Sequence, residues 1–260
     1  MDPVSQGVVG AAFAQIAARR TTLATVAWYG ALGGMAPDLD VLFQSSADPL
    51  FFLEFHRQFT HSLIFIPVGA FLVFLVLRAV ANRIKILQGL STGQAYLACL
   101  MGYATHGLLD SCTSYGTQLF WPFSDERVAW DTMSIVDPLF TMPLLVFVIA
   151  AARTQRQWLS CLACGWMLGF LALGWLQHER AIQAAAQVAS LRGHEPLRLS
   201  VKPSFANLLV WKAIYEHEDS YYVDAMRVGA QTTWFPGARV PKLDLTRHFP
   251  GLEVDSQQAL

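Results

Sequence analysis

The sequence predicts an all-α, polytopic membrane bundle of four or five spans, followed by a small C-terminal extramembrane domain rich in β-structure. Three observations support this fold class. Only 14% of the 260 residues are charged, whereas about a quarter are charged in an ordinary soluble domain. Several almost wholly apolar runs reach about 20 residues, the length that crosses ~30 Å of hydrocarbon. Residues 180–260 return to ordinary polarity.

Composition also excludes three classes of protein. A disordered chain is polar and poor in aromatic residues, yet 54% of this chain is hydrophobic and it contains 17 Phe and 8 Trp. The 18 basic and 19 acidic residues give a net charge of −1. We therefore expect no nucleic-acid partner held by bulk charge. Four cysteines in 260 residues are too sparse for a disulfide scaffold.

Before the spans, residues 4–18 form a short apolar helix that we expect to lie on or dip into the bilayer. The acidic Asp2 argues against a cleaved signal peptide, so we expect this segment to be retained. Three strong spans each contain at most one charged residue, near one end: residues 62–80, 134–152 and 158–177. Two weaker spans lie at 21–36 and 95–112. Counting one weak span fewer gives four.

Basic residues predict the orientation of these spans, because cytoplasmic loops are enriched in Lys and Arg. Three groups carry them: Arg19 and Arg20 before the first span, Arg78, Arg83 and Lys85 after the second, and Arg153 and Arg156 between the fourth and fifth. If all three groups are cytoplasmic, the five spans alternate without conflict. The loops at 37–61 and 113–133 and the C-terminal tail then face outward.

The tail has the pattern of a small antiparallel β unit. Residues 197–201 alternate between apolar and polar, as in a half-buried strand. Residues 208–215 and 221–228 are rich in β-branched and aromatic residues, and the acidic stretch between them predicts a turn. We therefore expect a membrane domain at 1–178 and an extramembrane domain at 179–260.

Residues able to carry chemistry gather at the outer ends of the predicted spans. His106 and Asp110 are four apart, so they share one face of a helix. His61 begins a strong span, and Asp38 and Asp40 end the first one. Under the predicted topology, all five residues reach the same membrane surface. Two imidazoles with two carboxylates form a nitrogen and oxygen shell that suits zinc or a similar first-row metal such as manganese.

Two other interpretations stay open. A histidine within a span more often makes a hydrogen bond between helices, and an aspartate at a helix end is more often a cap. The cluster would then only hold the bundle together. A metal-ion carrier is the third interpretation, because ionisable groups in spans also mark ion paths. It is disfavoured because residues 70–77, in the inner half, are wholly apolar.

Several segments in order resemble the YdjM-type family of bacterial inner-membrane proteins, which are described as metal-dependent hydrolases. These segments, within residues 1–150, are MDPVSQGVVGAA, GGMAPDLDVLF, FHRQFTHSL, HGLLDSCTSYGTQLFWPFSD and IVDPLFTMPLL. The tail segment WKAIYEHEDSYYVDAMRVG resembles an extension found in one branch. The resemblance implies a multi-pass protein of the bacterial inner membrane. With the predicted topology, the site and the C-terminal domain face the periplasm.

More distantly, the order Asp, His and His-x-x-x-Asp is similar to the superfamily of zinc-dependent phospholipases C and single-strand nucleases. This similarity implies one metal held by Asp38 or Asp40 together with three further ligands: His61, His106 and Asp110. Those enzymes use further histidine ligands, whereas no His follows Asp110 until His178. We therefore expect one metal, with Asp131 or Asp137 able to contribute to a second.

The expected reaction is metal-assisted hydrolysis of a phosphoester. Asp38 or Asp40 is the candidate general base, as well as a candidate ligand. Arg57 and Arg127 are candidates to bind phosphate. The expected residues that bind substrate or orient the ligands are His56, Arg57, Thr60, Arg127, Asp131 and Asp137. A site at the bilayer surface favours a membrane lipid or another amphipathic substrate.

Overall fold

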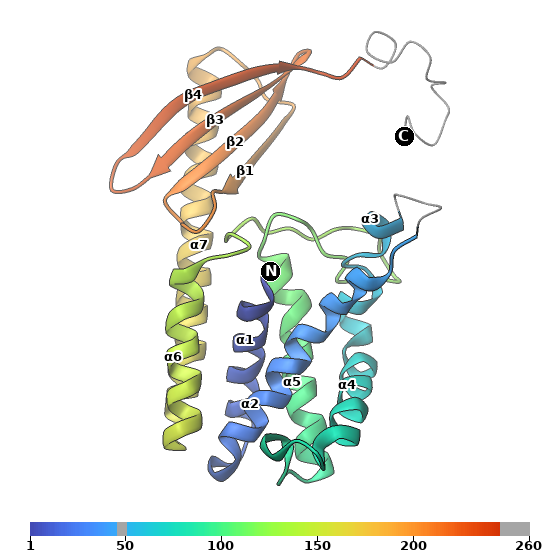
Figure 1. Cartoon of the computed structure of the whole chain (residues 1–260). Helices are drawn as coiled ribbons and strands as arrows, with labels where there is room; N and C mark the ends of the chain where they lie inside the picture. Colours follow the sequence, from blue (N-terminus) through green and yellow to red (C-terminus); the bar gives the residue numbers. More distant parts are fainter. Residues whose placement is uncertain (46–50, 245–260) are drawn as a thin grey trace. The chain divides into compact units, whose positions relative to one another are not determined.

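The structure, a computed structural model, describes residues 1–45 and 51–244 (Figure 1). About 57% of the chain is helical, and four strands near the C-terminus form one antiparallel sheet. A mainly helical chain with a C-terminal β unit is thereby confirmed. Residues 46–50 of the predicted outer loop and residues 245–260 of the predicted C-terminal domain lie outside the described residues.

The chain divides into two compact units. The first contains Met1–Leu176 and Pro203–Leu208, and the second contains Gln177–Lys202 and Leu209–Leu260. The long helix α7 (Trp158–Leu191) contributes residues to both units, because it continues well beyond the apolar run that predicted it. The predicted domain boundary after residue 178 stays a prediction.

Local sequence signals start the helices of the first unit. These helices are α1 (Pro3–Ile16), α2 (Leu23–Met35), the short α3 (Phe51–Phe55), α4 (Ile66–Ala81), α5 (Thr92–Ser111) and α6 (Pro138–Thr154). Asp2 caps α1, with Pro3 as the first helical residue. Ser91 and Gln94 form a reciprocal capping box at the start of α5. Asp137 caps α6 by accepting hydrogen bonds from two backbone amides.

Within the described residues, two helical segments are long and apolar enough to cross a membrane by length and composition: Leu63–Ala81 and Trp158–Leu191. Helix α6 is apolar but has 17 residues, and α2 has 13. The four or five spans expected from the sequence therefore stay a prediction.

Helix α1 packs inside the first unit, and the expectation that residues 4–18 lie on or dip into the bilayer stays a prediction. Figure 1 shows it beside α2, α5 and α6, and 10 of its 14 residues are buried. Three glycines allow this close packing. A Cβ on Gly102 of α5 would lie 2.0 Å from the Gly30 carbonyl oxygen of α2, and one on Gly10 of α1 would lie 2.4 Å from the same oxygen. Small residues let helix backbones approach in this way.

The second unit packs the C-terminal part of α7 against a four-stranded sheet. The strands, in spatial order, are β1 (Arg198–Pro203), β2 (Val210–His217), β3 (Ser220–Val228) and β4 (Thr232–Pro241). Ala181, Ala185 and Val188 of α7 form a core with Trp211 and Met226 of the sheet. The sequence patterns had indicated the first three strands. They missed β4, whose residues are exposed throughout and therefore show no alternation of burial.

An ion pair with a buried carboxylate and a partly exposed guanidinium ties α7 to the sheet within this unit. The Arg192 guanidinium donates two hydrogen bonds to the Asp224 carboxylate, at 2.7 and 3.0 Å. The Gly237 amide donates a third to Asp224, at 3.0 Å. Burial acts to raise the pKa of Asp224, but these hydrogen bonds outweigh it and hold the pKa below its ordinary value. The ionised pair therefore stabilises the folded unit above that pKa.

We expect Gly102→Ala to destabilise the first unit by about 1–3 kcal/mol, because the added methyl group would overpack the contact with Gly30. Thermal unfolding of the detergent-solubilised chain measures this as a lower Tm. Gly93→Ala in the same helix is the matched control, since no atom lies within 4 Å of the added Cβ. Equal Tm values for the two variants would contradict the close helix contact.

We expect Asp224→Asn to destabilise the second unit at pH 7 by about 1.5–3 kcal/mol, the range for hydrogen bonds to charged groups. The difference from wild type should shrink as the pH falls below about 4, because the carboxylate of the unfolded chain takes up a proton there and the folded one follows at lower pH. Hydrogen exchange of the β3 amides, compared between the two proteins at each pH, measures the effect. A difference that stays constant from pH 7 to pH 3 would contradict the assignment.

Candidate metal centre

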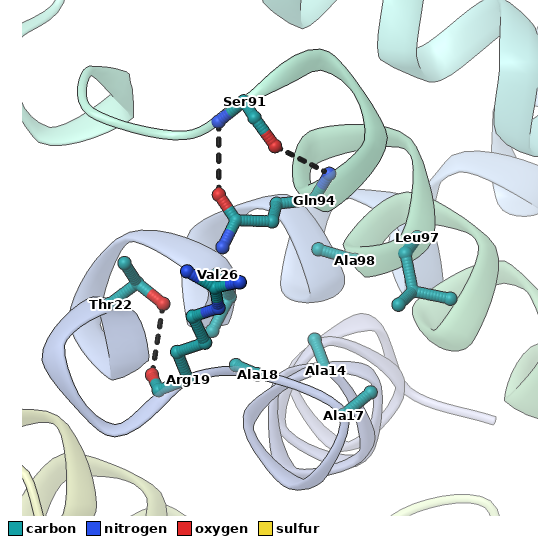
Figure 2. A pocket seen from close by; sticks show the side chains of 10 residues that line it. All are labelled: Ala14, Ala17, Ala18, Arg19, Thr22, Val26, Ser91, Gln94, Leu97 and Ala98. Atoms are coloured by element: carbon teal, nitrogen blue, oxygen red, sulfur yellow. Dashed lines mark hydrogen bonds between the residues drawn. The ribbon is translucent and has the colours of Figure 1, made fainter.

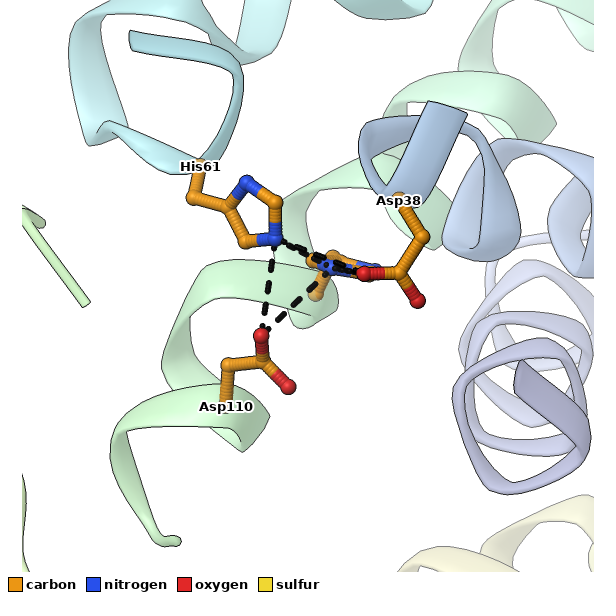
Figure 3. A group of neighbouring side chains, drawn as sticks. Asp38, His61 and Asp110 are labelled. Atoms are coloured by element: carbon orange, nitrogen blue, oxygen red, sulfur yellow. Dashed lines mark hydrogen bonds and ion pairs between the residues drawn. The ribbon is translucent and has the colours of Figure 1, made fainter. Parts of the chain in front are cut away.

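Four side chains converge at one end of the first unit, and three of them are labelled in Figure 3. Asp38 comes from a 3₁₀ helix, Ala36–Leu42, that continues α2. His61 ends a second 3₁₀ helix, Phe59–His61. His106 and Asp110 lie one turn apart near the end of α5. Each side chain offers one ligand atom, and these four atoms all lie within 4.8 Å of one another.

The spacing of these atoms fits a small cation with four ligands. His106 Nε2 lies 2.9 Å from His61 Nε2 and 3.4 Å from Asp38 Oδ1. Asp110 Oδ2 lies 3.4 Å from His61 Nε2 and 3.8 Å from His106 Nε2. Asp38 Oδ1 lies 3.6 Å from His61 Nε2. In a tetrahedral zinc site with bonds of 2.0–2.1 Å, the ligand atoms lie about 3.3–3.4 Å apart.

Helix α2 determines which nitrogen of His106 faces the group. The Nδ1–H of His106 donates a hydrogen bond to the Gly34 carbonyl, which leaves the Nε2 lone pair directed at the other three residues. Gly34 is itself held close to α1, since a Cβ there would lie 2.6 Å from the Gln6 carbonyl oxygen. The glycine packing of the helices therefore also orients this imidazole.

A polar network orients His61 so that its Nε2, like that of His106, faces the other ligands. Thr60 Oγ1 lies 2.9 Å from His61 Nδ1 and donates to Asp40 Oδ2 at 2.9 Å, so Thr60 can accept the Nδ1–H. Asp40 also accepts hydrogen bonds from the His56 ring, at 2.8 Å, and from the Arg57 amide, at 3.1 Å. Asp40 therefore faces Nδ1 of His61, whereas the four-residue group faces Nε2. The structure gathers Asp38, and not Asp40, into that group.

Asp110 connects the group to α1 and to a buried arginine. Its Oδ1 accepts a hydrogen bond from Gln6 Nε2 at 2.9 Å. The same oxygen forms an ion pair with the Met1 α-amino group. Its Oδ2 lies 3.3 Å from Arg57 Nε. The sequence patterns did not indicate Gln6 and Met1 as partners of Asp110. A glutamine in a mostly apolar helix was the signal for Gln6.

Arg57 has an unusual backbone. Its φ angle is 63°, in the left-handed region that non-glycine residues rarely adopt. The side chain is buried, and the guanidinium lies 5.2 Å from the centre of the Tyr115 ring. The Arg57 carbonyl accepts a hydrogen bond from the Gln118 amide at 3.0 Å. Such strain persists only where the surroundings hold it, and it concentrates at functional sites.

The remaining predicted residues lie outside the four-residue group. Arg127 donates hydrogen bonds to the carbonyls of Glu54 and His56, both at 3.2 Å, and so holds the loop that carries His56. Asp137 accepts hydrogen bonds from two amides at the start of α6, which makes it a helix cap. Asp131 has a φ angle of 51° and lies in the loop before α6.

The electrostatics of the group favour a positive charge at its centre. Burial alone would raise the pKa of Asp38, but hydrogen bonds with His106 and His61 hold it below its ordinary value. Burial also acts to lower the pKa of His61. Hydrogen bonds to three carboxylates, of which Asp110 has the largest effect, outweigh burial and raise the pKa to about 10. In the metal-free chain, His61 is therefore protonated at neutral pH, and a metal would replace that proton.

Solvent reaches the group from one side. The side chain of Asp38 is 20% exposed, whereas those of His61, His106 and Asp110 are fully buried. A polar substrate can therefore approach next to Asp38.

A pocket at the N-terminal ends of α2 and α5, away from the four-residue group, offers different chemistry (Figure 2). Its volume is about 380 Å³. None of the ten side chains labelled in Figure 2 is a histidine, cysteine, aspartate or glutamate. Arg19 is the charged residue among them, and several of the others are alanines. The pocket therefore lacks the ligands of a metal site.

Comparison with known families identifies the first unit. Residues 1–181 match the family described as YdjM inner membrane protein. The chain belongs to the YdjM family. The match contains all four residues of the group and confirms the family resemblance of the sequence motifs.

A curated relative of this YdjM-family chain is the inner membrane protein YbcI of Escherichia coli (strain K12). The two are 28% identical over 155 residues, which cover 58% of this chain and 82% of YbcI. Because both the family and this relative are inner membrane proteins, they support a bacterial inner-membrane location. No solved structure matches the chain.

We expect Asp110→Ala to destabilise this YdjM-family chain by about 3–5 kcal/mol, because it leaves the buried Arg57 without its carboxylate partner. Chemical unfolding of metal-free protein in detergent measures the loss. Asp125→Ala is the control, since Asp125 is exposed in a loop. Equal stability of the two variants would show that the Arg57 contact contributes little.

Proposed function

We propose that this chain is a metal-dependent hydrolase of the bacterial inner membrane. Asp38, His61, His106 and Asp110 would hold one divalent metal, with zinc preferred and manganese the alternative. One observation carries this proposal. Four potential ligand atoms lie within 4.8 Å of one another, while the Nδ1 atoms of both imidazoles are hydrogen-bonded elsewhere.

A metal held by these four side chains would need a water as a further ligand. It would then make that water acidic enough to lose its proton near neutral pH and would stabilise negative charge on a phosphoryl oxygen. Asp38 directs one oxygen toward the imidazoles and the other away from them (Figure 3). We assign this second oxygen to accept the proton of the attacking water. Asp40 and Thr60 hold His61 in the orientation that a metal requires.

The proposed reaction is hydrolysis of a phosphoester. Arg57 supplies a fixed positive charge beside the group, 3.3 Å from Asp110. Arg127 lies close to Arg57. Burial is the main cause that lowers the pKa of Arg127, and the charge of Arg57 lowers it further. Two cations beside a metal centre favour an anionic substrate. A membrane lipid with a phosphorylated headgroup is the proposed substrate, because the chain belongs to a membrane family.

We propose four or five spans with the basic loops in the cytoplasm. The four-residue group and the C-terminal domain then face the periplasm. The apolar helices α4, α6 and α7 support this arrangement. The segments that contain α4 and α7 are long and apolar enough to cross a membrane, and α6 is slightly shorter.

A second candidate function is non-catalytic. The Asp110 carboxylate already has partners in Gln6, Arg57 and the Met1 amino group. Such a network can hold α1, α5 and the 57–61 segment together without any metal. The protein would then be a structural component of the envelope.

Metal analysis separates the two candidates. We expect about one zinc or manganese per chain in protein loaded and washed in detergent, by analogy with other mononuclear sites. Asp38→Asn should lose this metal and stay folded, because Asp38 is the most exposed of the four ligands. Mass spectrometry measures the metal, and size-exclusion chromatography checks the fold.

Asp125→Asn is the charge-matched control and should keep the metal. Wild-type protein that binds no metal after loading would refute the metal site and favour the structural role. Metal that persists in folded Asp38→Asn would refute the assigned ligand set.

A further inference from the structure

We infer that an apolar groove formed by α2, α4 and α5 holds one acyl chain of a membrane lipid, with the polar headgroup at the four-residue group. This inference deepens the proposed function and rests on it for the fate of the headgroup. The groove itself is a separate feature of the first unit and can be tested without any reaction.

The groove has the size and the lining of a site for an apolar chain. Its volume is about 560 Å³, within the range of about 300–1,000 Å³ typical of small-molecule sites. Leu32 of α2 and Leu72, Val73 and Val76 of α4 are among the residues that line it. Aliphatic side chains of this kind bind hydrocarbon without offering it hydrogen bonds.

One end of the groove lies beside the candidate metal centre, although none of the four ligands lines it. Asp40 and Thr60, the two residues that orient His61, line that end. Pro37 and Leu39, which flank Asp38 in the chain, also line it. We place the headgroup at this end because Asp38, the exposed member of the four-residue group, lies between the lining residues Pro37 and Leu39 in the chain.

The groove extends from this end along α4. Its lining runs from Phe65 to Leu77, a distance of about 18 Å at 1.5 Å per residue. This wall belongs to the segment Leu63–Ala81, which is long and apolar enough to cross a membrane. The groove therefore has a polar end and an apolar length on a candidate span, which matches the division of a lipid into headgroup and tail.

Tyr103 and Gly69 shape the middle of the groove. A Cβ on Gly69 would lie 2.2 Å from the Tyr103 ring, so glycine allows the ring to lie across α4. The Tyr103 hydroxyl donates a hydrogen bond to the Thr60 carbonyl at 2.8 Å. The polar atom of Tyr103 is therefore satisfied by the protein and makes no demand on a ligand in the groove.

An acyl chain fits this groove better than a helix of a second copy. A helix with its side chains is about 10–12 Å wide. A single hydrocarbon chain is thinner. Its attached headgroup also accounts for the polar end, for which an apolar helix face offers no partner.

The test uses the full-length protein in detergent with a phospholipid that carries a photoactivatable diazirine in one acyl chain. We expect labelling to saturate and to map by mass spectrometry to the groove peptides of α2 and α4. The paired variant Leu72→Trp/Val76→Trp fills the groove and should lower this labelling about tenfold, equivalent to ~1.4 kcal/mol of binding. Both residues are more than half exposed, so folding tolerates the change.

Phe71→Trp/Leu75→Trp is the matched control. It has the same spacing on the same helix, its two residues are 48% and 47% exposed, and neither lines the groove. Its labelling should equal that of wild type. Non-saturable labelling, equal loss in both paired variants, or a dimer that disappears only in the groove variant would overturn the inference.

Metal content, measured on the same samples, separates this inference from the proposed function. The groove variant should bind as much metal as wild type, since it alters none of the four ligands. Saturable groove labelling in a chain that binds no metal would support the groove and refute the hydrolase. Bound metal without saturable labelling would refute the groove and leave the hydrolase standing.

Discussion

The arrangement of the first unit depends on one electrostatic constraint. Two imidazole nitrogens and two carboxylate oxygens face one another in a largely buried space, and such a set of acceptors is stable only around a positive charge. In the metal-free chain a proton on His61 supplies it, and we propose that a divalent metal supplies it in the working protein. The close glycine contacts of α1, α2 and α5 serve this constraint, because they bring the Gly34 carbonyl to His106 and the Gln6 amide to Asp110.

Local patterns in the sequence predicted much of this site. His106 and Asp110 could be paired because helical spacing alone places them on one face. The choice between Asp38 and Asp40 could not be made, since it depends on a 3₁₀ turn and on the partners that Asp40 finds in the 56–60 loop. Gln6 was missed because its contact with Asp110 joins residues 104 positions apart.

The fold shows the same division between local and tertiary information. Long apolar runs identified α4, α6 and α7, and β-branched residues identified the second and third strands. The packing of α1 within the bundle could not be predicted, because its small apolar residues fit a membrane surface as well as a close-packed interior. The fourth strand was missed because an exposed edge strand lacks the alternation that marks half-buried ones.

The proposed site and groove describe one amphipathic binding region, and the central claim within it is the four-residue metal shell. X-ray absorption spectroscopy of the zinc-loaded, full-length protein tests that claim most directly. The account predicts a shell of nitrogen and oxygen ligands at about 2.0–2.2 Å, made of the four side chains and a water, with an imidazole scattering pattern and no sulfur. A sulfur shell at about 2.3 Å, or a six-coordinate shell of oxygen without imidazole, would contradict it.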